Sequence, residues 1–268
     1  MENSSLMTPK WKVYQHDVSK LLASLGFTTA VEETLEGARG KHEIDVTART
    51  MVAGINQLWV IECKRRKEPV KKEHVLTFLG IVSDVGADRG LMFSESGFQA
   101  GAIRSTSSTN MTLTSIEDFR RNTAVEMDNL RIREFEHRLE ELAEKYAALW
   151  DLGETEREVV FARYSGPPDM RGRNAPITVQ ARLSQMNEAL VNARYNRWPA
   201  WYHPLDEDDA VIRLLALDGL LLIIDHTITT CERIYEQMIN TELPVTDWRD
   251  LQPPELVELL NAIRQRGT

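Results

Sequence analysis

Two short β-prone segments carry the charged residues that most constrain how this chain can fold. Asp45 lies in the first, residues 43–48, while Glu62 and Lys64 end the second, residues 59–64. Because side chains alternate between the two faces of a strand, Glu62 and Lys64 point to one face and the apolar residues beside them point to the other, into a core. Asp45 and Glu62 are 17 positions apart, which is enough for two strands and a turn. We therefore expect a sheet that brings two carboxylates and an amine together.

This residue set has a chemistry of its own. Mg²⁺ prefers oxygen ligands and is commonly held by one or two carboxylates together with water and substrate phosphate. A lysine beside such a site can orient the attacking water and offset charge on the phosphate. A solvent-exposed charged strand face is the plainer alternative, since such triples arise by chance. The adjoining apolar residues favour the functional interpretation, because charges at the end of a buried strand usually serve a purpose.

The apolar spacing and the turn residues predict a mixed α/β order of elements before residue 120. A helix is expected from Thr8-Pro9 to Gly26, and a second helix is expected to open at Pro69. The predicted strands are residues 27–31, 43–48, 59–64, 89–94 and 111–114, with a short helix at 97–104 between the last two. The suspected site then lies on the second and third strands.

Several segments together resemble the Mrr-type branch of the restriction-endonuclease-like, or PD-(D/E)XK, nucleases, over about residues 8 to 119. They are Tyr14-Gln15, Leu21-Leu22, Leu25-Gly26-Phe27, Ile44-Asp45-Val46, Glu62-Cys63-Lys64, residues 86–90 and residues 94–98. The resemblance implies an αβββαβ core in which Asp45 and Glu62 bind Mg²⁺ or Mn²⁺ and Lys64 is the catalytic lysine. The carbonyl of Cys63 is a further metal ligand in this interpretation.

Other residues are assigned supporting roles. Many relatives place a glutamate on the first helix, where this chain has Gln15. Two arrangements are therefore open: one tightly held Mg²⁺, or a second Mg²⁺ that is held mainly by the substrate. His42 and Gln99 are possible accessory residues; a surface or hydrogen-bonding histidine and a plain helix start are the alternatives. The residues expected to bind nucleic acid are Lys41, Arg65, Arg66, Lys67, Lys71 and Lys72.

The net charge of −9 is unevenly distributed over the 268 residues. Residues 1–120 hold 15 basic and 15 acidic residues, which leaves 17 of the 32 basic and 26 of the 41 acidic residues to residues 121–268. Binding to a polyanion would therefore depend on the local basic patch rather than on a global field. Two cysteines make no disulfide framework, and neither a signal peptide nor a membrane span is evident, so a cytoplasmic protein is expected.

Residues 121–268 carry no comparable motif, and we expect a mainly helical accessory or oligomerisation domain beside a nuclease domain of residues 1–120. Helical patterns cover 116–150, 181–195, 208–240 and 254–265. The aromatic and arginine residues of 194–203 could stack bases or form an elbow between helices. Arg171 and Arg173 could contact phosphate or lie in a solvated loop, and the acidic run 206–209 resembles a helix N-terminus.

Two classes of function follow. The favoured one is a Mg²⁺-dependent endonuclease that cuts DNA, by resemblance in defence against foreign DNA, and that acts as a homo-oligomer, most simply a dimer. The other is a non-catalytic module that binds nucleic acid or a partner. A nuclease acting on RNA or on branched DNA is a variant of the first, and the sequence does not separate these substrates.

Overall fold

The computed structural model describes residues 9–166, 175–202 and 212–252, together with 254, 258 and 260–262. The chain divides into two compact units, Met1–Met127 and Asp128–Thr268, and each is described by itself. The boundary expected at residue 120 falls inside a helix of the first unit. In the described part of the chain, no helix has the length and apolar character needed to cross a membrane.

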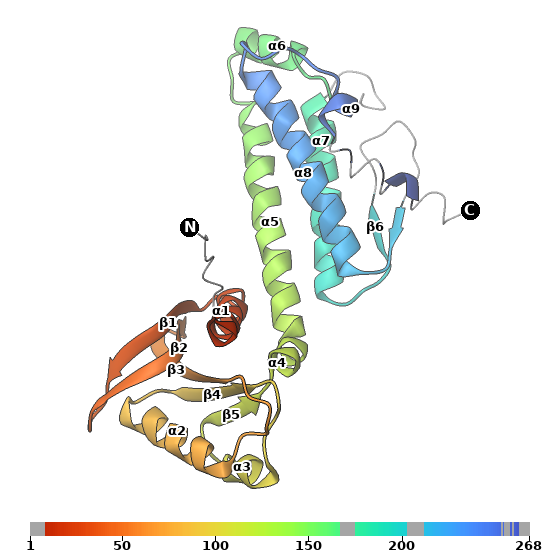
Figure 1. The fold of residues 1–268 in the computed structure, drawn as a ribbon. Helices are drawn as coiled ribbons and strands as arrows, with labels where there is room; N and C mark the ends of the chain where they lie inside the picture. The colour runs from red at the N-terminus through yellow and green to blue at the C-terminus, as the bar shows by residue number, and fades with distance from the viewer. Residues whose placement is uncertain are drawn as a thin grey trace, which may run out of the picture. The chain divides into compact units, whose positions relative to one another are not determined.

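The first unit is a mixed five-stranded sheet with helices on both faces (Figure 1). The strands lie in chain order: β1 and β3 flank β2 in antiparallel pairs, and β4 and β5 continue in parallel from β3. The elements are α1 (Lys10–Ala23), β1 (Thr28–Glu36), β2 (Lys41–Val52), β3 (Ile55–Lys64), α2 (Lys72–Asp84), β4 (Arg89–Ser94), α3 (Ala100–Ser105), β5 (Met111–Thr114) and α4 (Ile116–Asn122). The predicted αβββαβ core is confirmed.

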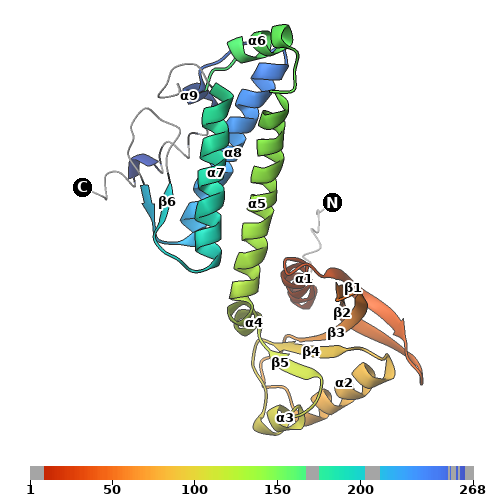
Figure 2. The same cartoon turned by 180° about the vertical axis from the view of Figure 1, so that it is seen from behind.

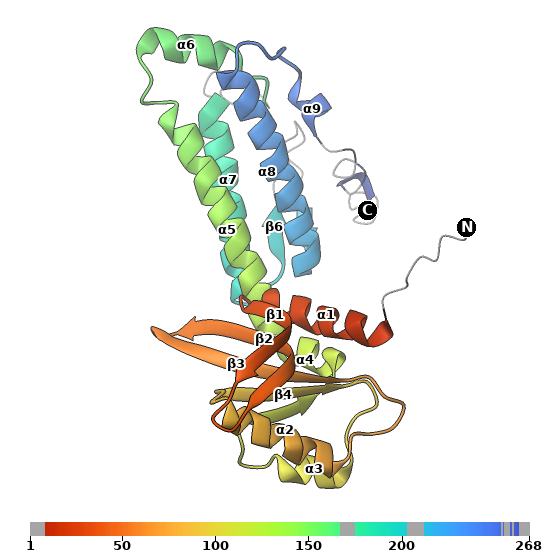
Figure 3. The same ribbon diagram turned by 60° about the vertical axis from the view of Figure 1, so that its left-hand side comes forward.

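Each face of the sheet has its own apolar core. On one face, Val18 of α1 packs with Ile61 of β3 and Phe93 of β4. On the other, Phe78 of α2 packs with Val60 and Met92. Figure 3 shows α1 on one side of the sheet and α2 and α3 on the other. Consecutive residues of β3 therefore enter opposite cores, as the alternation within residues 59–64 predicts.

The alternation of β2 is interrupted at Asp45. Ile44 packs in the core under α2 and Val46 in the core under α1, although side chains two apart normally share a face. Opposite this point, Glu32 of β1 has φ 55°, a conformation that non-glycine residues seldom adopt. The paired register passes from Val31 opposite Val46 to Glu33 opposite Ile44 and leaves Glu32 and Asp45 out. Asp45 thus lies at a local irregularity between two regular stretches of strand.

Some predicted boundaries in this unit are wrong. The helix expected at Pro69 begins at Lys72, because Val70 forms a parallel bridge with Phe98 instead. The strand expected at 27–31 extends to Glu36, paired with β2 along its length. The single helical pattern over 116–150 is two helices that break at Thr123. Thr8 lies outside the described residues, and the cap of α1 is Pro9.

The second unit packs long helices side by side (Figure 2). Its elements are α5 (Ala124–Ala148), α6 (Glu154–Ala162), α7 (Ala175–Arg194), β6 (Ala200–Tyr202), β7 (Ile212–Leu214), α8 (Leu217–Ile239) and α9 (Trp248–Leu251). Leu139, Leu183, Leu190 and Ile228 are among the residues of its buried core. The helix expected from residue 208 begins at Leu217, because Ile212–Leu214 pairs with β6. Arg171, Arg173, residues 206–209 and much of 254–265 lie outside the described residues.

Candidate active site

Glu62 and Lys64 occupy the carboxyl end of β3, where the strand leaves the sheet. Both side chains are about one-fifth exposed, and the Lys64 ammonium donates to a Glu62 carboxylate oxygen. β4 runs parallel beside them and ends at the same level, with Ser94 opposite Lys64. The strand alternation places the two charges on one face, as expected from the sequence. An ammonium and a carboxylate are thus held together at the rim of the sheet.

Asp45 is connected to this pair through the main chain. The backbone N–H of Cys63, the residue between Glu62 and Lys64, donates to Asp45 Oδ2 over 2.7 Å. Asp45 Oδ1 accepts a second hydrogen bond of 2.7 Å from the side-chain amide of Gln15 on α1. The break in the β2 alternation allows this carboxylate to reach both donors. The structure therefore brings Asp45, Glu62 and Lys64 into one cluster.

The electrostatics of the cluster favour a bound cation. Burial raises the pKa of Glu62, the Asp45 carboxylate raises it further, and Lys64 lowers it in part. Two carboxylates and one ammonium leave a net negative charge in a half-buried place, and a divalent cation would offset it. Gln15 adds a buried side-chain oxygen, Oε1, without a hydrogen-bond partner. Oxygen donors of this kind fit Mg²⁺ or Mn²⁺.

The donor set is small. Within the described residues, no group of three or more His, Cys, Asp or Glu side chains is placed to hold a metal. Two carboxylates are nonetheless enough for Mg²⁺, which usually keeps several waters and takes further oxygens from substrate phosphate. The Cys63 side chain faces the core under α1, and burial raises the pKa of its thiol well above the ordinary value. A role for Cys63 would thus fall to its carbonyl, as the sequence interpretation has it.

The predicted basic residues differ in what they contact. Arg65 donates to Glu95 and to the carbonyl of Lys10, and Arg66 lies 3.3 Å from a ring nitrogen of His74. Lys41 pairs with Glu36 at 2.9 Å on the surface. Lys67, Lys71 and Lys72 are exposed. Arg65, Arg66, Lys67, Lys71 and Lys72 follow the end of β3 in the chain and form a basic border there, whereas Lys41 begins β2 and lies next to His42, which contacts the end of α2.

His42 and Gln99 each have a hydrogen-bond partner within the first unit. His42 Nε2 lies 2.8 Å from Asp84 Oδ2, and Arg39 also pairs with Asp84. His42 therefore contacts the end of α2 rather than Asp45. The backbone N–H of Gln99 donates to the carbonyl of Val70, and α3 has only six residues. That N–H group is accordingly engaged within the protein.

The sequence interpretation missed how two residues act. The sequence presents Gln15 only as a replacement for a glutamate, whereas in the structure it donates a hydrogen bond to Asp45. Its place on the apolar face of the first helix, next to Tyr14 and three residues before Val18, was a signal of burial. Asp84, which holds His42 and Arg39, had no local signal, because its partners are more than 40 residues away in the chain.

A mixed sheet of αβββαβ order, with an acidic pair and a lysine where β2 and β3 separate, defines the restriction-endonuclease-like class of nuclease fold. Residues 6–122 match the family Mrr_cat, described as restriction endonuclease. The N-terminal unit is therefore an Mrr-type restriction-endonuclease domain, and the resemblance inferred from the sequence is confirmed for this part of the chain.

Comparisons beyond the family are distant. No curated protein matches the chain. The crystal structure of AF1548, a protein of unknown function, is similar over 96% of this chain and 100% of its own, with 17% identity and a TM-score of 0.35. The DNA modification-dependent restriction endonuclease AspBHI is similar over 48% of this chain and 44% of its own, with 15% identity and a TM-score of 0.29. Similarity at this level carries no argument about the site.

Proposed function

We propose that this protein is a Mg²⁺-dependent endonuclease that hydrolyses phosphodiester bonds of DNA. The observation that carries the proposal is the link between Asp45 and the main chain of Cys63, beside the ion pair of Glu62 and Lys64. This arrangement lies in a domain whose family is that of restriction endonucleases. An intact acidic pair with its lysine favours catalysis over the alternative of a non-catalytic binding module.

Each residue of the site has a proposed role in hydrolysis. Asp45 and Glu62, with the carbonyl of Cys63, would hold the cation, which would supply a Lewis acid for the phosphate and for the attacking water. Lys64 is placed to position the attacking water and to stabilise negative charge that develops on the phosphate. The exposed lysines Lys67, Lys71 and Lys72 would bind the DNA backbone without reading its sequence.

Cleavage assays with and without a divalent cation test this proposal. Purified protein should cut plasmid and linear DNA in Mg²⁺ or Mn²⁺, and EDTA should abolish cutting, because the carboxylates alone offer no Lewis acid. RNA and branched DNA in parallel reactions distinguish the alternative substrates. Cleavage that persists undiminished in EDTA would contradict the metal-dependent assignment. DNA binding without cleavage in any cation would favour the non-catalytic module.

Defence against foreign DNA is the setting that we propose, in the cytoplasm, where such DNA would be met. This part rests on the family of the first unit alone. The second unit would then control assembly or target choice. Its residues bring the acidic excess of the chain, so they are poorly suited to phosphate contact, and the basic border of the first unit is the better DNA surface.

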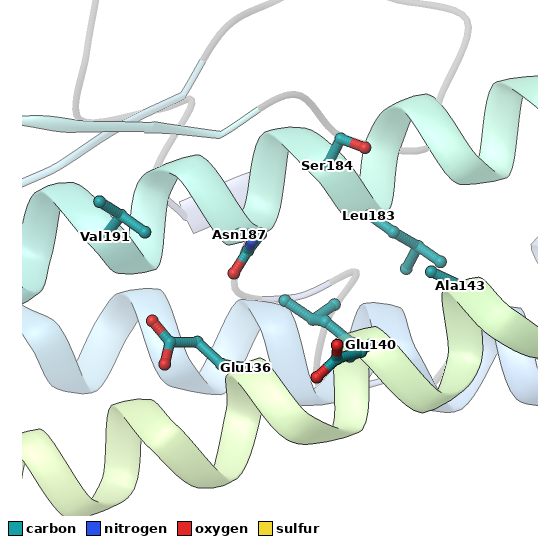
Figure 4. A pocket seen from close by; sticks show the side chains of 8 residues that line it. Glu136, Glu140, Ala143, Leu183, Ser184, Asn187 and Val191 are labelled. Carbon is teal, nitrogen blue, oxygen red and sulfur yellow. The ribbon is translucent and has the colours of Figure 1, made fainter.

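We further propose a homodimer held mainly by residues 121–268. Two strand cuts need two catalytic sites or two visits, and two-fold dimers are the commonest oligomers. An open groove of about 410 Å³ between α5 and α7 offers one surface for such contact (Figure 4). Its lining mixes apolar side chains, Leu139, Ala143, Leu183 and Val191, with polar ones, Glu136, Glu140, Ser184 and Asn187.

Light scattering at micromolar concentration should give twice the mass of the 30.6 kDa chain. Val191→Asp, which places a charge in the α5–α7 groove, should shift the protein toward the monomer and from double-strand breaks to nicks. Val159→Asp on α6 is the control, because Val159 is also an exposed valine but lies outside that groove. A monomeric wild-type protein that only nicks DNA would contradict the dimer.

A further inference from the structure

Gln15 is a buried polar side chain whose place in the fold is not explained by packing. It lies on the inner face of α1 beside Tyr14 and Val18, and only 4% of its surface is exposed. Its Nε2 donates to Asp45 Oδ1 over 2.7 Å, and its Oε1 has no partner. A methionine of similar length would leave no polar atom of its own unpaired.

Burial of such an amide is unfavourable unless its hydrogen bonds are made. Gln15 satisfies only its donor side. That donor is directed at one residue, the Asp45 carboxylate, which accepts its other hydrogen bond from the Cys63 main chain. The amide is therefore best explained by what it does for Asp45.

Two donors, one on each oxygen, fix the plane of the Asp45 carboxylate. One donor belongs to α1 and the other to β3, so the carboxylate is braced between two elements that pack in the same core. Each oxygen still has a second lone pair for a ligand. The unpaired Oε1 of Gln15 belongs to the same side-chain amide that donates to this carboxylate.

We propose that Gln15 is a positioning residue that orients Asp45 for cation binding, a role that rests on the proposed function. Hydrogen-bond partners of metal-binding side chains typically contribute ten- to hundredfold to metal affinity. Gln15 acts through Asp45 and needs no contact with the reacting phosphate. Its loss lowers the occupancy of the site by the cation, and a high cation concentration compensates for it.

Calorimetric titration of the full-length protein with Mn²⁺ tests this role. Gln15→Met should bind Mn²⁺ about ten- to hundredfold more weakly than wild type. Cleavage by this variant should be strongly reduced at low Mn²⁺ and should approach the wild-type rate at saturating Mn²⁺. Gln57→Met is the matched control. It is the same substitution, but Gln57 lies near the start of β3, whereas Glu62 and Lys64 lie at its carboxyl end. It should leave the Mn²⁺ affinity unchanged.

The outcomes are separable. Absence of Mn²⁺ binding by the wild-type protein would contradict the proposed function itself. Equal Mn²⁺ affinity of wild type and a folded Gln15→Met would overturn only the positioning role, and so would a loss of activity that saturating Mn²⁺ does not restore. If Gln15→Met does not fold, the positioning role can still be tested on the wild-type protein. Its Gln15 side-chain amide signal in ¹⁵N NMR should shift on addition of Mg²⁺, and an unmoved signal would refute the role.

Discussion

Asp45→Ala and Lys64→Ala should each lower the rate of DNA cleavage by on the order of 10²- to 10³-fold or more, because each removes a group that acts on the transition state. Asp45→Ala removes a proposed cation ligand, the carboxylate that accepts hydrogen bonds from Gln15 and from the main chain of Cys63. Lys64→Ala removes the ammonium group that pairs with Glu62. Initial rates of plasmid cleavage in Mg²⁺ measure the effect.

The two variants need controls for folding and for charge. Asp45→Asn keeps the shape of the side chain and an oxygen acceptor, so it should fold like wild type and still fail to cut. Lys67→Ala removes an exposed lysine three residues beyond Lys64 and should weaken DNA binding with a much smaller effect on the rate at saturating DNA. Full activity in a folded Asp45→Ala or Lys64→Ala protein would exclude this cluster as the catalytic site.

Tyr146→Ala should destabilise the second unit by about 3–5 kcal/mol, the usual cost of deleting a large buried aromatic side chain. Tyr146 is fully buried on α5 and donates through its hydroxyl to the carbonyl of Cys231 on α8 over 2.7 Å. Its ring also packs edge-on against the ring of Tyr235, with 5.5 Å between the two ring centroids. The side chain thus joins α5 to α8, and its loss leaves a cavity between these helices.

Urea unfolding monitored by circular dichroism measures this change. Tyr146→Phe keeps the ring and deletes the hydrogen bond, so it should cost only about 1–2 kcal/mol. The first unit has separate cores, so DNA nicking should survive in Tyr146→Ala if residues 1–127 suffice for catalysis. Double-strand cleavage should be lost with the dimer. An unfolding free energy equal to that of wild type would show that α5 does not depend on this contact.

The sequence by itself determined the elements whose pattern is local. Residues 89–94 and 111–114 form strands with the predicted bounds, because each is a short β-prone run between turn residues. The alternation within residues 59–64 also determined that Glu62 and Lys64 share a face. These properties depend on neighbours in the chain, which a single sequence displays directly.

The tertiary structure alone decided how Asp45 is held. The bond from Gln15 spans 30 residues, and the interrupted alternation of β2 depends on Glu32 of the neighbouring strand. The same holds for Ile212–Leu214, which forms a strand against β6 where a helical pattern was expected. The spacing of residues along the chain does not show which distant segments will become partners. A contact between distant segments is fixed only when the sheet and its covering helix have packed together.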